Sequence, residues 1–381
     1  MKKRIVALLL CLSMGIGMTA CSWLNGPAED TNTPQPTPSE TGTPAPTPDV
    51  TPDVTPDVTP EATPEPTPEA TPSANVTPVR FAVLSGPTGV GAAKLLSDNA
   101  AGLSKNTYEV TVATDNSEIS SKLINNDLDI ACMASNVAAN LYNKTGGGIQ
   151  TLCLSTLGVL YILEAGEKGF TPTVRSMGDL YGETIYATGQ GANPEYVLDY
   201  LLTANELDPD KDVEIVWKTA AEVQTALLTG EAKYAMLPVP AATAAQIQAR
   251  KSENCEIRSV LDLTEEWNSV TDYGVLTMTT VVVRTAFAQE HPELVEAFLE
   301  EYGASIAYVN GNVDDAAKMV VQFGIVPAEP IAKLAIPDCN LVFVTGDKMR
   351  DQIQGYYQVL FMANPASIGG GIPDDAFYYG M

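Results

Sequence analysis

The chain has 381 residues, a formal net charge of −26 and a single histidine, His291. Such an acidic chain repels a phosphate backbone, which excludes nucleic-acid binding. One histidine also excludes any site that needs two imidazoles. Fifteen of the 27 prolines lie between Pro27 and Pro78, so this segment differs in composition from the residues that follow it.

Residues 1–20 have the pattern of an export signal. Lys2, Lys3 and Arg4 precede a short apolar run, and the segment ends at Ala20, directly before Cys21. A small residue before a cysteine at this place resembles the lipobox of bacterial lipoproteins. The resemblance implies cleavage before Cys21, lipid on its sulfur, and an extracytoplasmic protein anchored to the outer face of the bacterial cell membrane. The alternative is an ordinary signal peptide with an incidental cysteine.

Residues 21–78 then predict a spacer. The tetrapeptide Thr-Pro-Asp-Val repeats over residues 47–58 and grades into Thr-Pro-Glu-Ala. Frequent prolines remove amide donors, and nine carboxylates without a cation repel one another. We therefore expect disorder here, and a glycosylated stalk stays open. No later apolar run reaches the roughly 18 residues that a membrane span needs.

From residue 79 the pattern alternates between strand and helix. Strands are predicted at residues 79–84, 108–113, 128–134, 183–188, 213–217 and 233–237, with helices between them. A long apolar run covers residues 149–163, and a second extended run covers residues 275–283. This order predicts an α/β fold with two parallel-type sheets, helices on both faces, and two crossings between the lobes. We expect residues 79–165 with 285–381 to form lobe 1 and residues 166–284 to form lobe 2.

Two glycine-rich turns follow predicted strands. The turn at Gly86 lacks the Lys-Ser/Thr pair of a phosphate loop, and the turn at Gly189 has Pro194 where a dinucleotide fingerprint has its third glycine. Both fail as nucleotide motifs. Each still presents backbone N–H groups at a helix N-terminus, which suits an anion or a polar ligand edge. The alternative is that these glycines only make tight turns. In two-lobed α/β proteins ligands bind beyond the carboxyl ends of the strands, which places a site between the lobes.

No catalytic or metal centre is predicted. The cysteines of the body, Cys132, Cys153, Cys255 and Cys339, are widely spaced and lack metal-site spacing, although a disulfide between two of them is conceivable. His291 precedes a proline at a helix start, and no nucleophile–base pair can be named. We expect no catalytic residue, no metal and no cofactor.

Several stretches resemble the substrate-binding proteins of bacterial ABC importers. MGDLYGETIYA (177–187) followed by GQGANPEYVL (189–198) is similar to that family's DLxGK and G-x-G/S-x-P segment. LLTGEAKYAMLPVP (227–240) is similar to its LxxGxVDAAxxxxP segment, although Lys233 and Tyr234 replace Val-Asp. HPELVEAF (291–298) and IGGGIPDDAFYY (368–379) also match. The branch is the NMT1/THI5-like and SsuA-like group, and the resemblance covers residues 79–381.

This resemblance implies a type II periplasmic-binding-protein fold that closes around one small ligand. It also implies neutral ligand contacts from loops of both lobes. These are Ser85, Gly86, Pro87, Thr88, Gly89, Ser135, Asn136, Ser155, Thr156 and Leu157 from lobe 1, and Thr188, Gly189, Gln190, Gly191, Asn193, Pro238, Val239 and Pro240 from lobe 2. Because this set has no arginine, a heterocycle or zwitterion is favoured over a bare sulfonate. Whether Arg80, Lys94 or Arg175 reaches the cleft stays open.

The function expected from the resemblance is capture of a small organic solute, such as a thiamine-precursor-like heterocycle or a sulfonate or taurine. The partners expected are the solute, an ABC permease with its ATPase, and the membrane through the lipid anchor, with the chain a monomer. The alternative is a surface sensor that uses the same fold without transport, a role that the long spacer favours.

Overall fold

The computed structural model describes residues 77–271 and 274–381. The predicted export signal, the lipidation site Cys21 and the spacer up to residue 76 lie outside the described residues. Within the described part, no helix has the length and apolar content to cross a bilayer.

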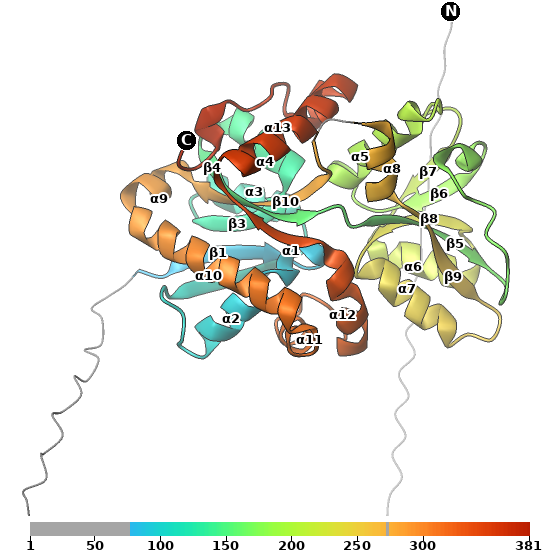
Figure 1. The fold of residues 1–381 in the computed structure, drawn as a ribbon, viewed down its shortest axis with the longest axis horizontal. Coiled ribbons are helices and arrows are strands. Elements are labelled where there is room, and N and C mark those ends of the chain that lie inside the picture. The colour runs from blue at the N-terminus through green and yellow to red at the C-terminus, as the bar shows by residue number, and fades with distance from the viewer. Residues whose placement is uncertain (1–76, 272–273) are drawn as a thin grey trace, which may run out of the picture. The chain divides into compact units, whose positions relative to one another are not determined.

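The first sheet has six strands in the order β11-β4-β10-β3-β1-β2. Their bounds are β1 Val79–Leu84, β2 Tyr108–Ala113, β3 Ile130–Ala134, β4 Ile149–Leu157, β10 Thr277–Arg284 and β11 Leu341–Val344. β1 pairs in parallel with β2 and β3, whereas β10 runs antiparallel to β3 and β4. Figure 1 shows α2, α10 and α11 on one side of this sheet and α4 and α13 on the other. Every residue of β3 is buried, as expected of a strand covered on both faces.

The second sheet has five strands in the order β7-β6-β8-β5-β9. Their bounds are β5 Leu160–Gly166, β6 Thr184–Ala187, β7 Glu214–Trp217, β8 Tyr234–Pro238 and β9 Glu256–Asp262. β6 pairs in parallel with β7 and β8, and β5 runs antiparallel to β8 and β9. One buried apolar cluster contains residues of both sheets, among them Phe81 and Ile185.

Helices connect these strands as the alternating pattern predicts. Their bounds are α1 Pro87–Val90, α2 Ala93–Ala100, α3 Asn116–Ile124, α4 Ser135–Thr145, α5 Asn193–Ala204, α6 Ala220–Thr229, α7 Ala241–Arg250, α8 Leu263–Val270, α9 Thr285–Glu290, α10 Pro292–Gly311, α11 Val313–Gln322, α12 Glu329–Ala335 and α13 Gly346–Ala363. Short 3₁₀ turns occur at Met177–Leu180, Ile336–Cys339, Pro365–Ile368 and Asp375–Phe377. Helix α6 shows why such bounds can be read from sequence. Thr219 and Glu222 form a capping box at its start, and Gly230 ends it in the left-handed conformation.

The α/β fold with two sheets and flanking helices is confirmed, but the sheets are mixed and not wholly parallel. The crossing strands β5 and β10 run against their neighbours. They also pair in the sheets opposite to those that the predicted lobe boundaries give them. The apolar run at 149–163 is continuous in hydropathy, so nothing in it marks Gly158, where the chain leaves the first sheet for the second.

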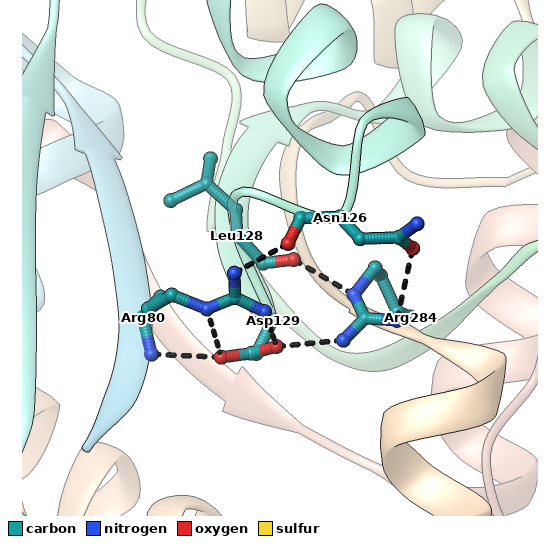
Figure 2. Close-up of polar contacts among 5 residues, drawn as sticks. All are labelled: Arg80, Asn126, Leu128, Asp129 and Arg284. Carbon is teal, nitrogen blue, oxygen red and sulfur yellow. Dashed lines mark hydrogen bonds and ion pairs between the residues drawn. The ribbon is translucent and has the colours of Figure 1, made fainter. Parts of the chain in front are cut away.

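A charged cluster joins three strands at the end of the first sheet where β1 and β3 begin (Figure 2). Arg80 donates to the Asp129 carboxylate from Nε at 2.9 Å, and Arg284 donates to it from Nη2 at 2.8 Å. Burial acts to raise the pKa of Asp129, but the hydrogen bonds from both arginines outweigh it, and the pKa lies below its ordinary value. Arg284 also donates to the Leu128 carbonyl at 2.9 Å. The cluster therefore joins β1, β3 and β10.

The four cysteines of the body are free in this structure. Cys132 on β3 and Cys153 on β4 both lie beside Val281 of β10, one on each side. Two strand spacings of about 4.8 Å separate them, which is too far for a disulfide without backbone movement.

Candidate functional site

A cleft of about 710 Å³ lies between the two sheets, where the parallel strands of both sheets end. On the first lobe its wall begins with Ser85 and Thr88 after β1, and continues with Thr114 and Asn116 after β2. Met278 and Thr279 of β10 add to this wall. Parallel strands have their carboxyl ends at one edge of a sheet, so these loops meet there.

The second lobe supplies the facing wall in the same way. Thr188 and Gly189 follow β6, Thr219 follows β7, Pro238 ends β8, and Pro240 follows it. The helices that begin at these loops present their first turns to the cleft. Thr219 caps α6, but no side chain caps the N-termini of α5 and α7. Backbone N–H groups in those first turns have no partner within their helix and can serve a ligand.

The lining of the cleft carries no charge. Among the described residues, no Asp, Glu, Lys, Arg or His side chain lines it, and no Phe, Tyr or Trp side chain does. Its polar groups are hydroxyls and amides, including Gln224 of α6 and Gln248 of α7. Pro194, Pro327 and Ile331 supply apolar surface that is at least partly exposed, whereas Val159, Leu160 and Ile325 lie in the wall with no more than 3% of their surface exposed. The cleft can therefore hydrogen-bond a polar group and accept an aliphatic chain, but it offers no carboxylate to an ammonium and no ring to a stacked heterocycle.

Half of the ligand contacts expected from sequence line this cleft. They are Ser85, Gly86, Pro87, Thr88, Thr188, Gly189, Asn193, Pro238 and Pro240. Their contact with a solute stays a prediction.

The other half lies elsewhere. Ser135, Asn136, Ser155, Thr156 and Val239 are buried in the protein. Gly89 is also buried and packs against the Leu84 carbonyl, and Leu157 ends β4. Gln190 and Gly191 are exposed beside the cleft loop.

The three cations left open by the sequence do not line the cleft. Arg80 belongs to the Asp129 cluster, and Lys94 is paired with Asp98 one turn along α2. Arg175 lies before the Met177–Leu180 turn, outside the lining. No cation therefore reaches the cleft in this structure from the part of the chain that is described.

Sequence reasoning missed several lining residues. Thr114 and Thr219 follow β2 and β7, so applying the strand-end rule to every parallel strand would have found them. Ile325 and Pro327 come from the segment between α11 and α12, and Ile331 comes from α12 itself. No motif marks this stretch. Thr279 lies within an apolar strand, where its hydroxyl approaches that of Thr88 at 3.2 Å.

A second hollow of about 740 Å³ lies outside the cleft, between α5, α8 and α13. It is lined by the sides of helices, and Asp199 faces it. Burial, reinforced by the negative charges of Glu195 and Asp210, raises the pKa of Asp199 to about 6. No strand ends here, so the cleft is the better candidate for a solute site. Among the described residues, no group of three His, Cys, Asp or Glu side chains is arranged to hold a metal ion.

Comparisons with known proteins agree with this architecture. Residues 171–316 match the family model described as NMT1/THI5 like. No curated protein sequence matches the chain significantly. Among solved structures, an ABC transporter protein from Parabacteroides distasonis has 23% sequence identity and a TM-score of 0.63, with 80% of this chain and 99% of that chain covered.

Two sulfonate-binding proteins have the same fold. The periplasmic aliphatic sulphonate binding protein SsuA from Escherichia coli has 14% identity and a TM-score of 0.61, covering 77% of this chain and 94% of that chain. The alkanesulfonate-binding protein SsuA from Xanthomonas axonopodis pv. citri, bound to MOPS, has 12% identity and a TM-score of 0.58, covering 79% of this chain and 96% of that chain. The resemblance seen in the sequence is thus confirmed: residues 171–316 form an NMT1/THI5-like region within a chain that has the periplasmic-binding-protein fold.

Proposed function

We propose that this chain is the solute-binding component of an ABC importer. It captures one small organic solute between its lobes and delivers it to a membrane permease. The observation that carries the proposal is the cleft itself, which lies at the strand ends of both sheets and is lined by residues of both lobes. The NMT1/THI5-like match and the fold support it. In this proposal the chain is a monomer, exported and held by lipid on Cys21.

The chemistry of the lining limits the class of solute that the cleft can bind. A sulfonate or a similar anion is bound well by backbone N–H groups at helix starts and by neutral hydroxyls and amides. The apolar surface of Pro194, Pro327 and Ile331, which is at least partly exposed, suits an alkyl chain. The sequence alone favoured a heterocycle or zwitterion, but the lining has neither a ring nor a carboxylate for one. We therefore favour an alkylsulfonate-like solute.

A thermal-shift screen of the ligand-free protein tests this proposal. It compares alkanesulfonates with taurine, thiamine precursors, riboflavin and nitrate. A solute that binds only the folded state raises Tm with its concentration, and occupancy at 100 times Kd stabilises by about 2.7 kcal/mol. We expect the largest shift with alkanesulfonates. A flat response to every class would contradict the proposed solutes.

Uptake then separates transport from sensing. Deleting the gene in the source bacterium should abolish uptake of the labelled solute that shifts Tm. Uptake that persists, with loss of the transcriptional response to that solute, would favour a surface sensor instead.

A further inference from the structure

Asn193, the first residue of α5, is fully buried and reaches from the second lobe into the first. Its Nδ2 donates to the Met278 carbonyl at 2.7 Å and to Ser135 Oγ at 3.0 Å. Its Oδ1 accepts from the Tyr356 hydroxyl at 3.0 Å and from the Asn136 backbone N–H at 3.3 Å. These partners lie on α4, β10 and α13, all of which belong to the first lobe.

These bonds use the whole capacity of the amide. A side-chain amide has two N–H donors and two lone pairs on its oxygen, and each is engaged here. A solute that bonded to Asn193 would have to displace a partner from the first lobe. Unpaired polar groups would then stay buried, which is costly. Asn193 lies in the wall of the cleft, yet all hydrogen-bonding groups of its amide are used by other residues of the protein.

The position of Asn193 is beside one of the two crossings between the sheets. Met278 lies at the start of β10, directly after the chain returns to the first sheet. The Tyr356 ring packs on Trp267 of α8 with ring centroids 5.4 Å apart, and Trp267 packs on Tyr200 of α5 at 4.9 Å. A polar contact is thus enclosed by aromatic rings from both lobes. A contact this close to a crossing moves little when the lobes rotate, so it can persist through closure.

We propose that Asn193 is a positioning residue at a non-covalent connection between the lobes. It holds the start of α5 on the first lobe, beside the two chain crossings. It thereby fixes the loop at residues 188–192, which supplies Thr188, Gly189 and Ala192 to the cleft wall. This role concerns the ligand-free protein, so it can hold or fail independently of the solute proposed above.

Two neighbouring tyrosines of α13 give a matched test. Tyr356 and Tyr357 are both fully buried. The Tyr356 hydroxyl bonds to Asn193 across the lobes, whereas the Tyr357 hydroxyl donates to the Ser135 carbonyl at 2.6 Å within the first lobe. Tyr356→Phe and Tyr357→Phe each remove one hydroxyl and keep the ring. Only the first removes a bond between the lobes.

The measurement is amide hydrogen exchange of the full-length, ligand-free protein, followed in peptides that cover residues 189–198. We expect these amides to exchange about fivefold faster in Tyr356→Phe than in wild type, which corresponds to one lost hydrogen bond. In Tyr357→Phe they should match wild type, with a similar drop in Tm for both variants. Asn193→Ala should give a larger acceleration in the same peptides. Equal exchange in the two phenylalanine variants would overturn the proposal, whether or not Asn193→Ala folds.

Discussion

The polar groups at the two ends of the parallel strands β1 and β3 differ in charge. Where β1 and β3 begin, two arginines enclose the Asp129 carboxylate, whose side chain is only 3% exposed. Where β1 and β3 end, the cleft is lined by neutral groups, with no charged side chain from the described residues. Charge therefore holds the strands together where they begin, whereas the strand ends carry the uncharged groups that we propose bind a solute.

Of the substitutions considered at these strand ends, removal of the buried Asp129 carboxylate should lower the free energy of unfolding most. Asp129→Ala leaves Arg284, a half-buried cation, without its anionic partner. We expect the free energy of unfolding to fall by about 2–4 kcal/mol. Urea denaturation measures it, with exposed Asp127→Ala as a control that changes stability by no more than about 0.5 kcal/mol. Similar losses in both variants would show that the cluster is not a specific support.

Low pH should gradually remove the contribution of the Asp129 cluster to stability. The folded pKa of Asp129 is lowered, so its contribution to stability is fully present above the ordinary aspartate pKa of about 3.9. This contribution is lost as the pH falls from there through the folded pKa. Urea denaturation between pH 2 and 5 should show a shallower acid loss in Asp129→Asn than in wild type. Parallel curves would mean that other carboxylates control the acid limit.

Asp199 offers a contrast to Asp129, because it is a partly buried carboxylate on whose pKa only the negative charges of Glu195 and Asp210 act among the described residues. Its folded pKa is raised to about 6, so the protein loses stability as the pH rises from about 4 through 6. Asp199→Asn should therefore stabilise the protein at pH 7 by about 1–2 kcal/mol and have little effect at pH 4. The control is Glu253→Gln, which removes an exposed carboxylate that is not among the charges acting on Asp199. A gain at pH 4 as large as that at pH 7 would exclude a charge effect.

Much of this fold could be predicted from the sequence, because its signals are local. Residues 79–84 and 108–113 form strands as predicted, and α6 forms between two predicted strands, where its capping box and Gly230 mark both ends. β9 and β11 were missed. They are edge strands, and the four-residue β11 lies among helices.

The candidate site was only half predictable, because strand ends are visible in sequence but side-chain direction is not. Ser85 and Thr188 directly follow parallel strands, and they line the cleft. Ser135 also follows a parallel strand, but its hydroxyl donates to the Thr277 carbonyl at 2.7 Å inside the protein. Ile325 reaches the cleft from a distant part of the chain through tertiary packing, which no local pattern encodes.

The central claim is that one solute binds in the uncharged cleft, and isothermal titration calorimetry of two neighbouring variants tests it most directly. Gln224 is half-buried and lines the cleft, whereas Thr225, the next residue of α6, is exposed. For the solute that raises Tm, we predict one site per chain in wild type and in Thr225→Trp. In Gln224→Trp, whose indole fills the cleft, binding should be at least about a hundredfold weaker, which corresponds to about 2.7 kcal/mol. Undiminished binding to Gln224→Trp would contradict the account and place the solute elsewhere.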